Sequence, residues 1–269
     1  MESQFLKKIV TARKRQVEKL KENLPWDALG RVAETRDDYR DFSGALTGGG
    51  PSVIAELKRA SPSRGLICTE YRPREIAASY ERAGARALSV LTEEEFFLGS
   101  LDDLKATRDG VRVPVLRKDF IIDDYQVYES AAAGADALLL IVAALGDADL
   151  KKLLDRSAQL KMAALVEVHT ERELERALDS GAHIIGVNNR DLNSFEVNLE
   201  TSFRLREKIP SSCLAVSESG IKSNHDIERL AGAGFNAVLI GESLMASGDP
   251  GKALGRLLER VSSLGMART

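Results

Sequence analysis

Residues 52–58 read SVIAELK, a short apolar run that ends in charged side chains, and seven further apolar runs follow it. A stretch with the apolar spacing of a helix separates each run from the next. Eight strand–helix units are typical of the parallel (β/α)8 barrel, which carries its chemistry at the C-terminal ends of its strands. The sequence therefore predicts an α/β protein with a single (β/α)8 TIM barrel. The runs begin near Ser52, Arg86, Val113, Ala137, Met162, His183, Cys213 and Asn236.

An open, doubly wound sheet is the alternative architecture. It would leave eight parallel strands with unpaired edges, and the chain lacks the Gly-x-Gly-x-x-Gly fingerprint of such sheets. A repeated helix ending supports the barrel, because Gly84, Gly134, Gly181 and Gly234 each precede a strand and suit a glycine C-cap. The closed barrel is the better prediction.

Composition excludes several classes of protein. The chain has 269 residues, 43% of them hydrophobic and 29% charged, which suits one soluble barrel with a large core. Its 38 basic and 41 acidic side chains leave a net charge of −3, so no basic excess points to nucleic acid. No apolar run is long enough for a membrane span, and the first residues do not resemble a secretory signal.

The cysteines and histidines argue against a disulfide framework or a metal site. Cys68 and Cys213 are far apart, which suits a reducing compartment and predicts a cytoplasmic protein. His169, His183 and His225 have no partner at metal-ligand spacing. We therefore expect no metal and no cofactor.

Residues 1–47 differ from the repeating units. Apolar residues between Phe5 and Leu24 recur at helical spacing among many lysines and arginines. A surface helix packed on the barrel is the simpler interpretation, and a helical extension over the barrel mouth is the alternative. Gly48-Gly49-Gly50-Pro51 precedes a strand, which indicates a linker and not a phosphate loop. The predicted division is a helical extension at 1–47 and the barrel at 48–269.

Charged side chains converge at the ends of the first and third strands. Ile54, Glu56 and Lys58 share one face of their strand, because side chains alternate with period two. This face should point into the barrel, so the pair Glu56 and Lys58 either forms a structural salt bridge or belongs to a site. Lys118 ends the third strand. We expect clustered cations and partial burial to lower the pKa of Lys118 and make it a proton donor near neutral pH.

Later strands add further polar groups. Glu167 lies between apolar neighbours and needs a buried partner, for which Lys118 or Lys58 is suited. Asn188 and Arg190 end the sixth strand with donors that suit an oxygenated substrate. Of the pair Phe96 and Phe97, one suits the core and the other could line a pocket for an aromatic ring.

The last two strands are followed by small residues, as in an anion site. Ser219 and Gly220 follow the seventh strand, while Gly241 and Glu242 follow the eighth. Barrels often bind phosphate with backbone N–H groups of these two loops, and glycine permits close approach of the backbone. The residues alone thus favour a cofactor-free enzyme that acts on a phosphorylated small molecule by acid–base chemistry.

Five stretches of the chain resemble the indole-3-glycerol-phosphate synthase family of tryptophan biosynthesis. They are IAELKRASPS at 54–63, LRKDF at 116–120, VEVH at 166–169, GVNNRDL at 186–192 and SESGI at 217–221. The family also carries a helical N-terminal extension over its active site, which suits residues 1–47. The resemblance implies ring closure, decarboxylation and dehydration of 1-(2-carboxyphenylamino)-1-deoxyribulose 5-phosphate.

The resemblance also implies roles for individual residues. Lys118 corresponds to the general acid that protonates the ketone, and Glu167 to an acid–base residue of the dehydration. Lys58 would hold the carboxylate, with Glu56 and Asn188 orienting lysines and substrate and Ser219 positioning the reacting end. Backbone N–H groups of Gly220, Gly241 and Glu242 would bind phosphate, the Glu242 side chain turning away from it. The expected substrate-binding residues are Ser61, Phe97, Phe120, Arg190, Glu218, Gly220, Gly241 and Glu242.

Two alternatives remain for the function. Another phosphosugar barrel enzyme, such as phosphoribosylanthranilate isomerase, would need a cysteine–aspartate pair at strand ends, yet Cys213 begins its strand. A non-catalytic barrel would have little reason to direct lysines and glutamates into one mouth. We expect a small phosphorylated substrate, no nucleic-acid or membrane partner and a monomer, with association with other tryptophan-pathway enzymes left open.

Overall fold

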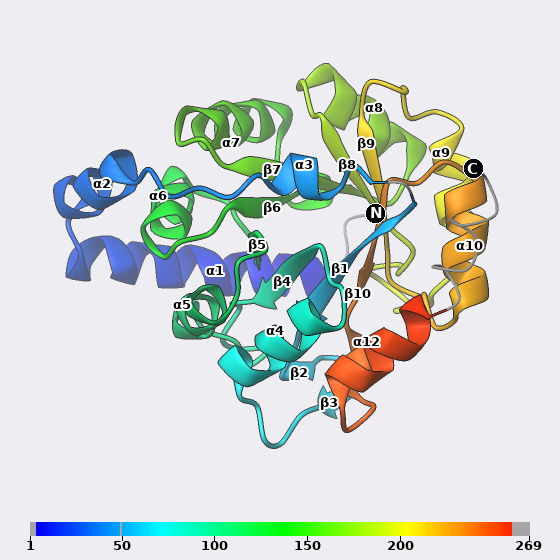
Figure 1. Ribbon diagram of the computed structural model, residues 1–269. Helices are drawn as coiled ribbons and strands as arrows, with labels where there is room; N and C mark the ends of the chain where they lie inside the picture. The colour runs from blue at the N-terminus through cyan, green and yellow to red at the C-terminus, as the bar shows by residue number, and fades with distance from the viewer. Residues whose placement is uncertain (1–3, 49, 260–269) are drawn as a thin grey trace.

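The predicted barrel is present. In the computed structural model, which describes residues 4–48 and 50–259, eight parallel strands close on themselves (Figure 1). Each strand pairs with its neighbours in chain order, and β1 closes the barrel by pairing with β10. Each begins and ends close to the predicted run. The strands are β1 (Ser52–Leu57), β4 (Ala87–Leu91), β5 (Val115–Lys118), β6 (Ala137–Ile141), β7 (Ala163–Val168), β8 (Ile184–Asn188), β9 (Leu214–Glu218) and β10 (Ala237–Ile240).

Helices flank the barrel, and one follows each strand. A short hairpin of β2 (Ala60–Ser61) and β3 (Gly65–Leu66) lies after β1, and a 3-10 turn η1 (Val142–Ala144) follows β6. The sequence did not predict these two features. The helices of the repeating units are α4 (Pro73–Arg82), α5 (Leu101–Gly110), α6 (Asp124–Ala132), α7 (Asp147–Gln159), α8 (Glu171–Asp179), α9 (Glu200–Arg206), α10 (Asn224–Gly232), α11 (Glu242–Met245) and α12 (Pro250–Leu258).

Local signals explain where these helices begin and end. The side chains of Ser100 and Asp123 accept backbone N–H bonds at the starts of α5 and α6, as expected of N-caps. The four predicted glycine caps all have positive φ, which glycine adopts without steric cost. The chain thus turns sharply from helix into strand at the expected places.

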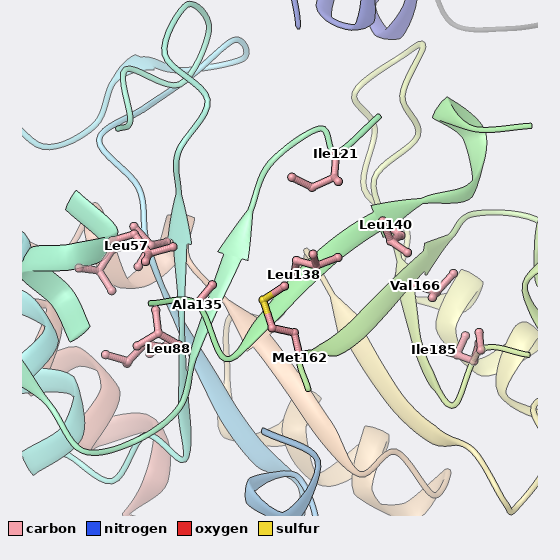
Figure 2. Close-up of a cluster of buried hydrophobic side chains, with 14 of the residues drawn as sticks. Leu57, Leu88, Ile121, Ala135, Leu138, Leu140, Met162, Val166 and Ile185 are labelled. Atoms are coloured by element: carbon pink, nitrogen blue, oxygen red, sulfur yellow. The ribbon is translucent and has the colours of Figure 1, made fainter. Parts of the chain in front are cut away.

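The strands separate two apolar layers. Val53, Ala55 and Leu57 of β1 belong to the large outer cluster between strands and helices, whereas Ile54 belongs to a smaller cluster inside the barrel. Figure 2 shows part of the outer layer, including Leu57 and neighbours from other strands. Since Glu56 and Lys58 share the face of Ile54, they point inward at the C-terminal end, as predicted.

The N-terminal segment contacts both ends of the barrel. It contains α1 (Gln4–Asn23), α2 (Trp26–Thr35) and α3 (Phe42–Ala45), and α2 packs beside α6 (Figure 1). Phe5, Leu6 and Ile9 of α1 border the cavity at the C-terminal mouth. Phe42 and Leu46, just before β1, are buried in the inner cluster with residues that begin strands. The boundary between residues 47 and 48 stays a prediction, and residues 1–3, 49 and 260–269 of the predicted domains lie outside the described residues.

None of the helices within residues 4–48 and 50–259 combines the length and the apolar character that a membrane span requires.

Candidate active site

A cavity of about 680 Å³ lies at the C-terminal ends of the strands. Every site residue expected from the sequence lines it, because the closed barrel brings the ends of distant strands to one mouth. These residues are Glu56, Lys58, Ser61, Phe97, Lys118, Phe120, Glu167, Asn188, Arg190, Glu218, Ser219, Gly220, Gly241 and Glu242.

Lys118 lies at the centre of the charged groups. Its Nζ is 2.9 Å from Oε2 of Glu167 and 3.2 Å from Oε2 of Glu218. Both carboxylates are almost fully buried, with 2% of each side chain exposed, and 13% of the Lys118 side chain is exposed. The expectation that Glu167 takes a lysine partner is confirmed, and that partner is Lys118.

The expected fall in the pKa of Lys118 is wrong. Burial would lower this pKa, but the negative charges of Glu167, Glu218 and Glu56 outweigh burial and raise it well above its usual value. The prediction failed because it counted neighbouring lysines, whereas the nearest charges are carboxylates. Lys118 is therefore an ammonium group throughout the neutral range.

Glu218, unlike Lys118, is close to losing its charge at neutral pH. Burial and the nearby charge of Glu167 outweigh the attraction of Lys118 and raise the pKa of Glu218 to about 7. Glycine at position 186 makes room for this carboxyl group, since a Cβ there would lie 2.2 Å from Oε1 of Glu218. The site thus holds an ionised carboxylate, Glu167, beside one that can exchange a proton near neutral pH.

Glu56 and Lys58 form an ion pair inside the cavity. Oε1 of Glu56 is 2.6 Å from Nζ of Lys58, and the two side chains are 3% and 17% exposed. Gly241 packs against this pair, because a Cβ at that position would lie 2.3 Å from Oε1 of Glu56. Gly241 is therefore needed to admit Glu56, a reason that the sequence did not suggest.

A second group of charges lies at the ends of β8 and β10. Glu242 turns its carboxylate to two guanidinium groups, with 2.8 Å to Nε of Arg64 and 3.2 Å to Nη2 of Arg190. Ser219 and Gly220 follow β9 with φ angles of 67° and 84°, a left-handed conformation that is strained for serine. This end of the cavity is suited to an anion.

Aromatic side chains also border the cavity. The rings of Phe97 and Phe120 are 6.3 Å apart, and both line the cavity. Phe96 instead packs edge to face on Phe5 of α1. At the apolar end of β6, Ile141 lines the cavity, while the next residue, Val142, packs in the outer layer.

Sequence reasoning missed several residues that line the cavity. Arg64 comes directly after the stretch IAELKRASPS at 54–63, but its ion pair with Glu242 depends on the β2–β3 hairpin. The residues of α1 lack polar groups that could have marked them. The missed residues in the wall include Phe5, Leu6, Ile9, Arg64, Leu192, Phe195, Val197 and Lys222.

Among residues 4–48 and 50–259, no group of three or more His, Cys, Asp or Glu side chains is arranged to hold a metal ion. The residues present can donate and accept protons and can hold anions.

The sequence model of the indole-3-glycerol phosphate synthase family matches residues 6–257 of this chain.

The chain belongs to the indole-3-glycerol phosphate synthase family.

Relatives with that name cover nearly the whole chain. One from Polaromonas naphthalenivorans (strain CJ2) is 49% identical over 95% of this chain and 98% of its own length. Another from Chloroherpeton thalassium is 50% identical over 90% and 95% of the two chains. A third from Mycolicibacterium vanbaalenii is 53% identical over 81% and 80%. The resemblance inferred from the five sequence stretches is confirmed.

Solved structures of other barrels resemble the fold alone. A mandelate oxidase mutant with an FMN adduct superposes with a TM-score of 0.60 at 18% identity, covering 81% of this chain and 74% of its own. Thiamine phosphate pyrophosphorylase from Pyrococcus furiosus has a TM-score of 0.60 at 15% identity, covering 79% of this chain and 96% of its own.

Family membership excludes the isomerase alternative, and Cys213 is buried just before β9, away from the cavity.

Proposed function

We propose that this cavity binds 1-(2-carboxyphenylamino)-1-deoxyribulose 5-phosphate and that the residues at the strand ends convert it to indole-3-glycerol phosphate. Membership of the family makes the protein a carboxy-lyase of tryptophan biosynthesis. The observation that carries the assignment of roles is the position of Lys118 between Glu167 and Glu218 in the barrel mouth.

The substrate has an anionic group at each end, which suits the two charged regions of the cavity. Arg64 and Arg190 offer guanidinium groups for the phosphate, together with backbone N–H groups of Gly220, Gly241 and Glu242. For the phosphate to bind, the Glu242 carboxylate must leave these arginines. Lys58 suits the benzoate carboxylate, with Phe97 and Phe120 beside the aromatic ring. Ser61 lies in the same wall and offers a hydroxyl group.

Ring closure joins the aromatic carbon that bears the carboxylate to the ketone carbon. As this bond forms, the ketone oxygen takes a proton from the ammonium group of Lys118. The buried carboxylates keep Lys118 protonated between turnovers, so the acid is ready for each substrate. Glu218, 3.2 Å away, can return a proton to the amine after donation.

Two losses complete the reaction. Carbon dioxide leaves, and the electrons of its bond restore the aromatic ring. The new hydroxyl group then leaves as water with a proton from an acid, while a base removes a proton from the adjacent ring carbon. Glu167 is the acid–base group for this step, with Asn188 and Glu56 orienting the charged side chains and Ser219 the reacting end.

The direct test supplies the substrate to the purified protein without metal or cofactor and follows indole fluorescence. We expect fluorescence to rise and one carbon dioxide to form for each product molecule. Folded protein that produces no signal would refute the proposed function. The monomeric state, the absence of a cofactor and the cytoplasmic location stay predictions.

A further inference from the structure

His169 lies beside Glu167 but takes no part in the mechanism above. It is the first residue after β7, and 11% of its side chain is exposed. Its Nε2 is 3.5 Å from Oε1 of Glu167 and has no hydrogen-bond partner among residues 4–48 and 50–259. Lys118 meets the other oxygen of Glu167, Oε2, at 2.9 Å. Each oxygen of the Glu167 carboxylate therefore faces its own nitrogen.

Glu173 of α8 holds the opposite side of the imidazole. Its Oε2 accepts the backbone N–H of His169 at 2.8 Å and lies 3.2 Å from Nδ1 of the ring. Residues 170–173 read TERE, the pattern of a capping box, in which Glu173 would bond back to Thr170. Thr170 does cap α8, with its hydroxyl accepting from the backbone of Glu173, but the Glu173 carboxylate is directed to His169 instead.

The two carboxylates decide which form of the ring fits. A neutral imidazole has one N–H and one lone pair, so either tautomer would turn a lone pair toward a carboxylate. The imidazolium ion has two N–H groups and can donate to both Glu173 and Glu167. Charges from several elements act on the ring, namely those of Glu167 on β7, Glu173 on α8, Glu218 on β9 and Asp191 after β8. Lys118 on β5 pairs with the Glu167 carboxylate that faces the ring.

These charges also act on the acidity of the ring. Burial would lower the pKa of His169, but the hydrogen bond to Glu173 and the charges of Glu167, Glu173 and Glu218 outweigh it and raise the pKa. For Glu167, burial would raise the pKa, but Lys118 and His169 lower it.

We propose that His169, held by Glu173, is a positioning residue that fixes the Glu167 carboxylate from the side opposite Lys118 and keeps it ionised as a base. This inference rests on the proposed acid–base role of Glu167. The Glu173–His169–Glu167 arrangement uses the carboxylate–imidazole orientation known from other enzymes, in which an acidic group sets the tautomer and direction of a histidine. Here the histidine acts on a second carboxylate and touches no reacting atom.

Two substitutions of His169 separate the contacts. His169→Gln places a neutral donor near the position of Nε2, whereas His169→Asn keeps a donor only near the position of Nδ1. We expect His169→Asn to reduce kcat on the order of tenfold with KM changed less than twofold. The acid limb of its kcat–pH profile should shift upward by about one pH unit, because Glu167 loses a cation. His169→Gln should recover part of kcat but keep the pH shift.

Glu173→Gln and His225→Gln complete the design. Glu173→Gln keeps an acceptor for the backbone of His169 and removes the charge, so we expect a smaller pH shift in the same direction. His225, exposed on α10, is the matched control, and its substitution should leave kcat and the profile unchanged. Equal loss of kcat in both His169 variants with an unmoved acid limb would overturn the proposal and indicate a purely structural role for His169.

Ring ¹⁵N shifts of His169 give a measurement that needs no turnover. We expect the His169 ring to titrate above the usual histidine value in the wild type and at lower pH in Glu173→Gln. Titration at or below the usual histidine value in the wild type would reject the proposal, even in an active enzyme. A charged His169 in a protein that does not convert the substrate would instead reject the proposed function.

Discussion

Lys118 is the residue on which the proposed chemistry depends most. Lys118→Ala removes the ammonium group between Glu167 and Glu218, so the ketone oxygen would lose its proton donor. We expect turnover to fall on the order of 10²–10⁴-fold, the usual contribution of a general acid. Initial rates of indole formation at saturating substrate measure this effect. Lys152→Ala, on the exposed face of α7, is a control that should retain full turnover. Turnover within twofold of wild type for Lys118→Ala would end the assignment.

Glu218 predicts a pH-dependent stability. Its pKa in the folded protein is about 7, against an ordinary value of 4.5. Between these values the folded state holds the additional proton, so the free energy of unfolding should fall as pH rises through this window. Glu218→Gln removes this term, and its stability relative to wild type should increase on the order of 2 kcal/mol from pH 4.5 to 8.

Chemical denaturation of both proteins at several pH values measures this difference. Titrating groups distant from Glu218 contribute equally to both proteins, so the difference between the curves reports Glu218 and the groups on which its charge acts, including His169. A difference that does not change with pH would show that folding leaves the pKa of Glu218 at its ordinary value.

At the scale of elements, the link between α1 and β5 has the clearest consequence. Arg13 of α1 is buried and bonds both oxygens of Asp119, the residue after Lys118. Arg117 also pairs with Asp119, so the Asp119 carboxylate keeps a charged partner if Arg13 is removed. The helix over the cavity is thereby attached beside the proposed general acid.

We expect Arg13→Ala to lower the free energy of unfolding by about 1–3 kcal/mol, because a buried charged acceptor loses one of its donors. Backbone amides of α1 should exchange hydrogen faster than in the wild type, as measured by mass spectrometry. Lys14→Ala, one residue away and exposed, should change stability by no more than about 0.5 kcal/mol. Unchanged exchange in α1 would show that other contacts hold the helix.

At the scale of the whole molecule, the two ends of the barrel have different roles. The charged groups lie at the C-terminal mouth, while Phe42 and Leu46 belong to the inner apolar cluster near the strand beginnings. In barrels of this kind, the N-terminal face serves stability and the C-terminal face chemistry.

Phe42→Ala tests this separation. Phe42 is 1% exposed, so its truncation should cost about 3–5 kcal/mol of unfolding free energy. We expect kcat of the folded fraction to change less than twofold, measured well below the melting temperature. A large loss of kcat without loss of stability would contradict the proposed division of roles between the ends.

The repeating pattern was sufficient to predict the eight strands and their polar ends. Apolar alternation placed Glu56 and Lys58 on the inner face, and turn residues marked where helices stop. These features depend on neighbours in the chain, so a linear sequence carries them. The β2–β3 hairpin and the short turn η1 were missed because their formation depends on contacts with the barrel and not on a local period.

Local patterns in the chain were enough to predict the strand–helix repeat and most of the polar side chains at the barrel mouth. How those side chains act on one another depends on the folded barrel. The pKa of Lys118 rises, Glu173 turns to His169 and Gly241 makes room for Glu56, each through atoms that belong to distant parts of the chain. Electrostatic and steric energies depend on distances and burial, and the closed barrel sets both.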